Sequence, residues 1–175
     1  TAINSVLTKN KAVLAYLISQ RARFENWLQI ETFKLLQEST NFIVELEYGY
    51  HNSQSRCDLW LSDGQTQAQW VEIKLCVTNY EKSKTNKKSA RPITNQISDI
   101  RADIEKLETL APSTALKTLI VVAYPLPEHF ADHPQWQDHM SSLRQHCPAI
   151  SLYQSHEISL MRQSTYLAIY VANFS

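Results

Sequence analysis

Two strand-like segments joined by a short turn limit the folds open to this chain. Residues 56–61 and 68–77 are rich in apolar, β-branched and aromatic side chains, and the intervening SDGQTQ contains the hairpin signal Asp63-Gly64. We therefore expect the two segments to be antiparallel neighbours. Apolar residues recur at helical spacing on both sides of them, which favours a sheet covered by helices over an all-β fold.

The remaining periodicity completes this outline. A short helix and then a longer one over residues 23–37 are expected at the N-terminal end, and Thr94 is a plausible N-cap for a helix over residues 95–110. A last helix is expected over 134–146, and further strands over 41–50, 116–124, 150–153 and 166–171. The order of elements predicts an α/β fold with a mixed central sheet flanked by helices.

Composition narrows the class of protein. A chain of 175 residues with 43% hydrophobic and 19% charged residues fits one globular domain spanning residues 1–175. Because the formal net charge is zero, any contact with nucleic acid must come from a local basic patch. The three cysteines lack C-x-x-C spacing and no secretory h-region is seen, so a cytoplasmic location is expected. No apolar run approaches the roughly 20 residues that cross a bilayer, and no membrane association is expected.

Charged residues on the two central strands suggest a chemical site. Side chains alternate along a strand, so Glu72 and Lys74 share one face while the apolar residues between them face a core. The hairpin brings Asp58 alongside, so two carboxylates and an ammonium group can converge. Carboxylate oxygens suit Mg²⁺ or Mn²⁺, and a lysine can stabilise a phosphodiester transition state or activate the attacking water. The alternative is an exposed edge strand with solvated charges.

Asp58 in RCDLWL and Glu72-Ile73-Lys74 in WVEIKL resemble the PD-(D/E)XK nuclease superfamily, which has the restriction-endonuclease-like fold. The resemblance covers roughly residues 21–124 and implies an αβββαβ core, with the C-terminal residues as additions. It also implies that Glu31, on the helix before the first strand, is an additional metal ligand. Gln96 or Arg101 would be an accessory residue on the helix after the third strand. The implied activity is Mg²⁺- or Mn²⁺-dependent hydrolysis of DNA, with RNA as a less favoured substrate.

A basic stretch follows the strand that carries Glu72 and Lys74. Its cationic residues are candidates for phosphate contact, although a solvated loop would have the same composition. They are Lys82, Lys84, Lys87, Lys88 and Arg91. Cutting both strands of a duplex would suggest a homodimer. The rival interpretation is a non-catalytic subunit of nuclease-like fold that binds within a larger nucleic-acid-processing or defence complex.

Other residues with chemical potential are assigned to structure. His129 and His133 have i, i+4 spacing, but Pro134 follows at once, so a loop with two surface histidines is expected. Cys57 and Cys76 are interpreted as small buried packing residues. The four tryptophans are interpreted as core residues rather than base-stacking platforms.

Overall fold

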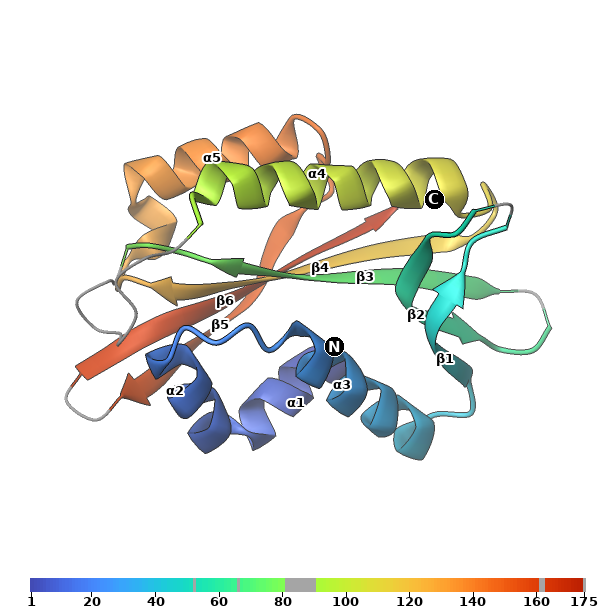
Figure 1. Cartoon of the computed structure of the whole chain (residues 1–175), viewed down its shortest axis with the longest axis horizontal. Helices are drawn as coiled ribbons and strands as arrows, with labels where there is room; N and C mark the ends of the chain where they lie inside the picture. The colour runs from blue at the N-terminus through green and yellow to red at the C-terminus, as the bar shows by residue number, and fades with distance from the viewer. Residues whose placement is uncertain (52, 66, 81–90, 161–162, 175) are drawn as a thin grey trace.

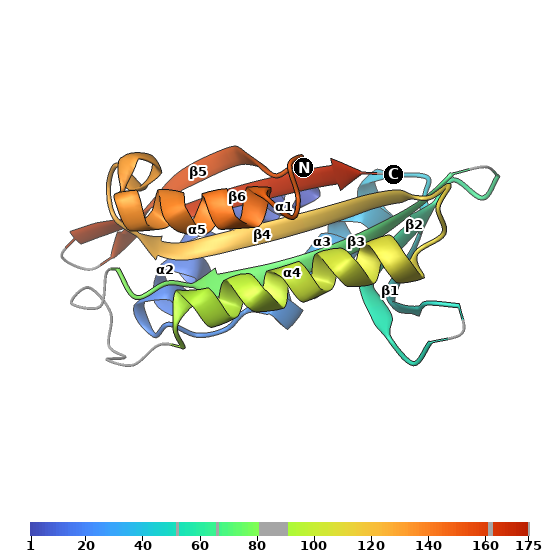
Figure 2. The same ribbon diagram turned by 90° about the horizontal axis from the view of Figure 1, so that it is seen from above.

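The computed structural model describes residues 1–51, 53–65, 67–80, 91–160 and 163–174, and these form three layers (Figure 1). A central sheet separates two sets of helices. One face carries α4 (Ile93–Leu110) and α5 (Pro134–Arg144), and the other carries α1 (Ala2–Lys9), α2 (Lys11–Ser19) and α3 (Glu25–Ser39). Figure 2 shows α4 and α5 side by side over the sheet, where α4 contacts the third strand. The predicted α/β class, with helices on both faces of a sheet, is confirmed.

Six strands form the sheet in the order β1-β2-β3-β4-β6-β5. They are β1 (Ile43–Gly49), β2 (Arg56–Ser62), β3 (Ala68–Val77), β4 (Leu116–Leu126), β5 (Ser151–Leu160) and β6 (Gln163–Phe174). β3 and β4 are parallel and every other neighbouring pair is antiparallel, so the sheet is mixed as predicted. The β2–β3 hairpin is also confirmed, with β3 at its predicted bounds.

The N-terminal region forms three helices where the sequence predicted two. The Asn10 side chain donates a hydrogen bond to the Val6 carbonyl (2.9 Å), which satisfies a carbonyl at the end of α1 and separates it from α2. Arg21, with φ at +47°, lies after the end of α2. None of the helices among the described residues has the length and apolar character needed to cross a membrane.

Alternation along β3 gives the two faces of the sheet different cores. Trp70 and Cys76 pack on the side of α4 and α5, whereas Val71, Ile73 and Leu75 pack on the side of the N-terminal helices. Glu72 and Lys74 therefore project toward α4, on the same face as each other, as their spacing predicted. The interpretation of Cys57 and Cys76 as buried packing residues is also confirmed, because both are fully buried and free.

The predicted bounds of α4, β5 and β6 were wrong. α4 begins at Ile93 with Pro92 as its N-cap residue, so Thr94 lies inside the helix and caps nothing. The last two strands are much longer than predicted, because most β5 side chains are exposed and give no alternating apolar signal. Pairing with β6 extends β5 through ten residues, a length that only the tertiary structure specifies.

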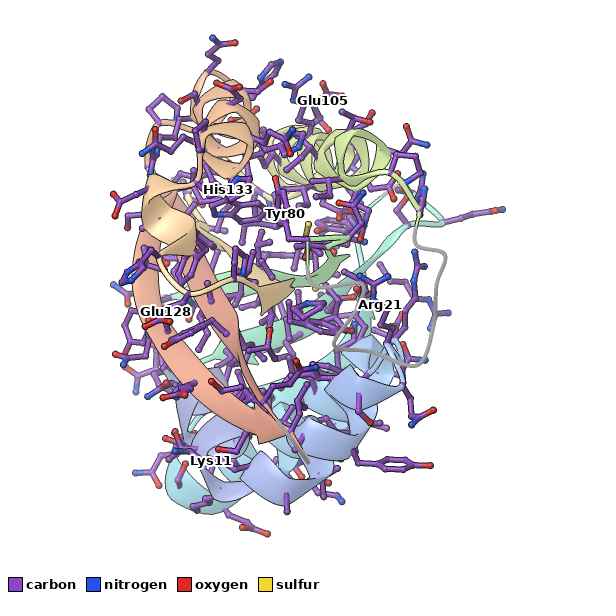
Figure 3. The ribbon with its side chains drawn as sticks, turned by 90° about the vertical axis from the view of Figure 1, so that its left-hand side faces the viewer. Lys11, Arg21, Tyr80, Glu105, Glu128 and His133 are labelled. Atoms are coloured by element: carbon purple, nitrogen blue, oxygen red, sulfur yellow. The ribbon has the colours of Figure 1, made fainter. Side chains whose placement is uncertain are left out.

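Figure 3 shows the end of the molecule toward which β3 and β4 run. Contacts at this end connect the sheet to the helices on both of its faces. Tyr80 and His133 lie together on the side of α4 and α5, with ring centroids 4.6 Å apart. Arg21 lies toward the N-terminal helices and donates from Nη2 to the Thr78 carbonyl (2.6 Å). The Tyr124 hydroxyl of β4 donates to the Ala22 carbonyl (2.7 Å). These bonds fix the segment before α3 against the sheet, so α3 starts beside β3.

Candidate active site

The site lies where β2 separates from β3. Their pairing ends at Leu59 and Val71, so the next outward-facing N–H group of β3, on Ile73, has no strand partner on that side. Asp58, the residue beyond Leu59, accepts this hydrogen bond through Oδ2 (2.6 Å). Asp58 therefore lies at the open edge of β3 and close to Glu72, and its place in the hairpin predicted the closeness to Glu72.

Two further side chains accept hydrogen bonds from N–H groups along the same edge of β3. Glu25, the first residue of α3, accepts a hydrogen bond from the Leu75 N–H through Oε2 (3.0 Å). Gln96 of α4 accepts from the Val77 N–H (2.7 Å) and donates to the Val77 carbonyl (2.8 Å). Because an unpaired buried N–H group is costly, these side chains are fixed in place by the backbone they satisfy.

Glu72 is the most buried ionisable group of the site, with 2% of the residue exposed. Its Oε1 accepts a hydrogen bond from the Tyr50 hydroxyl (2.9 Å) and forms an ion pair with Lys106 Nζ (2.6 Å). Lys106 also donates to the Arg56 carbonyl (3.1 Å). The Glu72 carboxyl group is thereby held inside the layer between β3 and α4.

Lys74 forms the second ion pair across this layer. Its Nζ lies 2.9 Å from Asp103 Oδ2, and Asp103 Oδ1 lies 3.9 Å from Lys106 Nζ. Asp103 and Lys106 are three residues apart on α4 and therefore lie on one face of the helix. They face Lys74 and Glu72, which lie two residues apart on one face of β3. The four side chains form a charge cluster that we call the β3–α4 square: Glu72, Lys74, Asp103 and Lys106.

Burial and mutual repulsion perturb the carboxylates. Burial, then repulsion from Asp58, raises the pKa of Glu72 to about 8, against the opposing effect of Lys106. Burial raises the pKa of Asp58 to about 6, while the Ile73 N–H, Lys106 and Lys74 oppose the shift and Glu25 adds to it. For Lys74, burial acts to lower the pKa, but Asp103, Glu25 and Asp58 outweigh it and the net shift is upward. Lys74 is therefore a cation at neutral pH.

The structure brings Asp58, Glu72 and Lys74 together, but it does not bring Glu31 to them. Glu31 is paired with Lys34 at 3.1 Å on the outer part of α3, with its side chain 32% exposed. It is six residues beyond Glu25, which on a helix means about 9 Å of rise and roughly 240° of rotation. Glu25 therefore holds the position near β3 that the sequence interpretation gave to Glu31.

The accessory predictions have mixed outcomes. Gln96 reaches the end of β3, but its hydrogen bonds with the described residues join it to backbone groups and not to the carboxylates. Arg101 faces α5, where Nη2 donates to the Ser142 carbonyl (3.1 Å). Arg91 forms a two-bond ion pair with Asp99 on α4. The predicted phosphate-binding residues Lys82, Lys84, Lys87 and Lys88 lie outside the described residues.

Sequence reasoning missed Tyr50, Glu25, Asp103 and Lys106. A signal existed for Asp103, because it lies among Ile100, Ile104 and Leu107 on the buried stripe of α4. A charged residue on an apolar helix face needs a partner, and Lys74 is that partner. The position of Glu25 had no comparable signal, because it depends on where α3 starts relative to the sheet.

A cavity of about 530 Å³ adjoins the square on the side of the N-terminal helices. Lys74 of β3, Glu25 of α3, and Gln96 and Asp99 of α4 line it together with residues of α2 and the segment that begins α3. The site is therefore accessible from a concave surface next to Lys74. Within the described residues, no group of three or more His, Cys, Asp or Glu side chains is arranged to hold a metal ion.

Comparisons with known proteins do not assign this chain to a family. No protein-family model, curated protein or solved structure gave a significant match to this chain. Inference about function therefore rests on the geometry of the site.

Replacing Glu72 with glutamine tests the burial of this carboxylate. Its ordinary pKa is 4.5 and its pKa in the folded protein is about 8, so the folded state binds more protons than the unfolded state between these values. Glu72 therefore reduces stability as the pH rises through that window. We expect the free energy of unfolding of Glu72→Gln, relative to wild type, to increase from about pH 5 to about pH 8 by a few kcal/mol.

Denaturant unfolding in metal-free buffer measures this difference at each pH. Glu31→Gln, at a surface position, is the matched control for the substitution itself. A Glu72→Gln difference that stays constant across the pH range would contradict the account.

Proposed function

We propose that this protein is a divalent-metal-dependent nuclease that hydrolyses DNA phosphodiester bonds, with a PD-(D/E)XK-type site. The observation that carries the proposal is the convergence of Asp58, Glu72 and Lys74 at the open edge of β3. The element order α3-β1-β2-β3-α4-β4 supports it, because it is the αβββαβ order that the resemblance implies. β5, β6 and α5 are then additions that complete the sheet and its helical cover.

The carboxylate oxygens of Asp58 and Glu72 are donors of the kind that Mg²⁺ and Mn²⁺ prefer. Each of Glu25, Asp58 and Glu72 has one oxygen in the hydrogen bonds or ion pairs described above, and its second oxygen takes no hydrogen bond from the described residues. Mg²⁺ commonly binds one or two carboxylates and completes its shell with waters and substrate phosphate oxygens. Asp58 and Glu72 would supply the direct ligands, with Glu25 acting through water. Such an ion would lower the pKa of a bound water and neutralise charge on the phosphodiester.

Lys74 has a defined role in this mechanism. Because its pKa is raised, it acts as a fixed positive charge and hydrogen-bond donor, not as the base that takes a proton. Asp103 holds its ammonium group at 2.9 Å, so the charge is positioned before substrate arrives. Lys74 would orient the attacking water and stabilise the negative charge that develops on the phosphate oxygens.

Lys106 balances charge in the same layer. Its ammonium group neutralises part of the charge on Glu72 and lies on Oε1, next to the Tyr50 hydroxyl. Binding through Oε2 would leave this pair intact. Lys106 therefore fixes the orientation of the Glu72 carboxylate in the protein, as Asp103 does for the Lys74 ammonium.

A second candidate is a non-catalytic subunit of nuclease-like fold that binds within a larger nucleic-acid-processing or defence complex. The observation that favours it is the β3–α4 square, in which both charges of the Glu-x-Lys motif already have partners within the protein. A site of this kind would be structural, with no requirement for a metal ion. Metal binding and cleavage distinguish the two candidates.

Replacing Lys74 with methionine removes its ammonium group and keeps most of the aliphatic stem. We expect Lys74→Met to reduce the rate of plasmid cleavage in Mg²⁺ by about 100-fold or more, because a positioned charge at the developing anion is lost. Lys34→Met is the matched control, since Lys34 is also paired with a carboxylate but lies on the surface. Equal cleavage by both variants would refute the assignment, and thermal unfolding shows whether each variant remains folded.

Titration calorimetry with Mn²⁺ examines the carboxylates directly. We expect wild-type protein to bind the ion and Asp58→Asn to lose most of that binding, because the amide supplies a neutral oxygen in place of an anionic ligand. Glu38→Gln, an exposed position at the far end of α3, is the control. Absence of binding in wild type would favour the non-catalytic subunit.

A further inference from the structure

The cavity beside Lys74 is lined by both apolar and polar side chains. Val13 and Leu17 of α2 and Trp27 of α3 belong to its apolar part. Its polar groups come from two cations, two amides and two carboxylates: Arg23, Lys74, Asn26, Gln96, Glu25 and Asp99. Its volume of about 530 Å³ falls in the range of small-molecule binding sites. Lys74 belongs to both the cavity and the β3–α4 square, so a molecule bound here would lie next to the proposed reaction centre.

Trp27 is held as a platform by its neighbours. It is half-buried, and its ring meets the edge of the Phe24 ring with centroids 6.0 Å apart. Phe24 is itself buried and stacked on Tyr124 of β4 at 4.7 Å. An aromatic ring fixed in this way loses little conformational freedom when a flat ligand stacks on it.

Arg23 provides a cation that forms no ion pair within the described part of the chain. It is exposed on the segment before α3 and makes no ion pair with any residue that the structure describes. This distinguishes it from Lys74, Arg91 and Lys106, whose charges are paired with carboxylates. Asn26 lies between Arg23 and Trp27 in the chain, and its exposed amide offers both a donor and an acceptor.

We propose that this cavity binds one unpaired nucleotide of a DNA strand adjacent to the phosphate that is cleaved. The base stacks on Trp27, Asn26 contacts its polar edge, and Arg23 binds the neighbouring phosphate. This proposal rests on the proposed nuclease function and names its substrate class, which is DNA with an unpaired nucleotide at the cleavage point, such as a single strand, a flap or a frayed end.

The preference for an unpaired nucleotide follows from the energetic cost of bringing a paired base to Trp27 in the cavity. A base within a duplex is stacked on both sides, and it can enter a pocket only by leaving the helix, which costs a few kcal/mol. A base in a single strand avoids most of this cost. A single aromatic platform is also the arrangement by which proteins bind single strands with little sequence preference.

The test measures binding of a fluorescent single-stranded oligonucleotide, and of the matching duplex, to the full chain in EDTA by anisotropy. We expect Trp27→Ala to weaken single-strand binding by about ten-fold and Trp27→Phe to retain most of it. Arg23→Ala, at an exposed position, should weaken binding and reduce its dependence on salt. Phe42→Ala removes an exposed aromatic residue near the start of β1, outside the cavity, and should bind as wild type does.

The possible outcomes distinguish failure of the nucleotide subsite from failure of the proposed nuclease function. If wild-type protein cleaves DNA in Mg²⁺ but Trp27→Ala and Arg23→Ala bind the single strand as tightly as wild type, the nucleotide subsite is refuted and the nuclease proposal stands. If wild-type protein binds no single strand, or prefers the duplex, the subsite is also refuted. If binding depends on Trp27 and Arg23 but no cleavage occurs, the nucleotide site is supported and the nuclease proposal fails.

Discussion

The structure depends on the point at which β2 leaves β3. Beyond the Leu59–Val71 pair, β3 has no strand neighbour on that side, and its N–H groups are satisfied by side chains from three different elements. A strand edge inside a folded protein must be satisfied in some way. Here two of the three acceptors are carboxylates, so the requirement of the backbone concentrates negative charge at one place.

The negative charge concentrated at the edge of β3 explains why lysine side chains lie around it. Asp58 and Glu72 are poorly solvated, and repulsion from Asp58 adds to the rise in the pKa of Glu72. Lys106 opposes the rise in the pKa of both carboxyl groups, and Lys74 opposes that of Asp58. The arrangement is less favourable for folding than an apolar interface of the same size would be. Sites that are costly in this way are common where a protein binds a cation or performs chemistry. The cost is consistent with the proposed function, in which a divalent ion relieves the repulsion.

Local patterns predicted the parts of the site that depend on one or two neighbouring elements. Alternation along β3 placed Glu72 and Lys74 on one face, and the hairpin placed Asp58 beside them. Sequence reasoning named Glu31 and did not single out Glu25, because periodicity alone does not locate the start of α3, which Arg21 and Tyr124 fix through contacts distant in sequence. Lys106 was missed for a similar reason, since its partner is on another element. The length of β5 was underestimated because it is set by pairing with β6.

The most direct test of the central claim is a crystal structure of the protein in saturating Mn²⁺, with anomalous scattering used to locate the ion. If Asp58 and Glu72 hold a divalent ion, we expect one peak at coordination distance from both, with Lys74 beside it and Lys106 still on Oε1 of Glu72. A difference map without a peak at this edge, and with both ion pairs of the β3–α4 square unchanged, would contradict it.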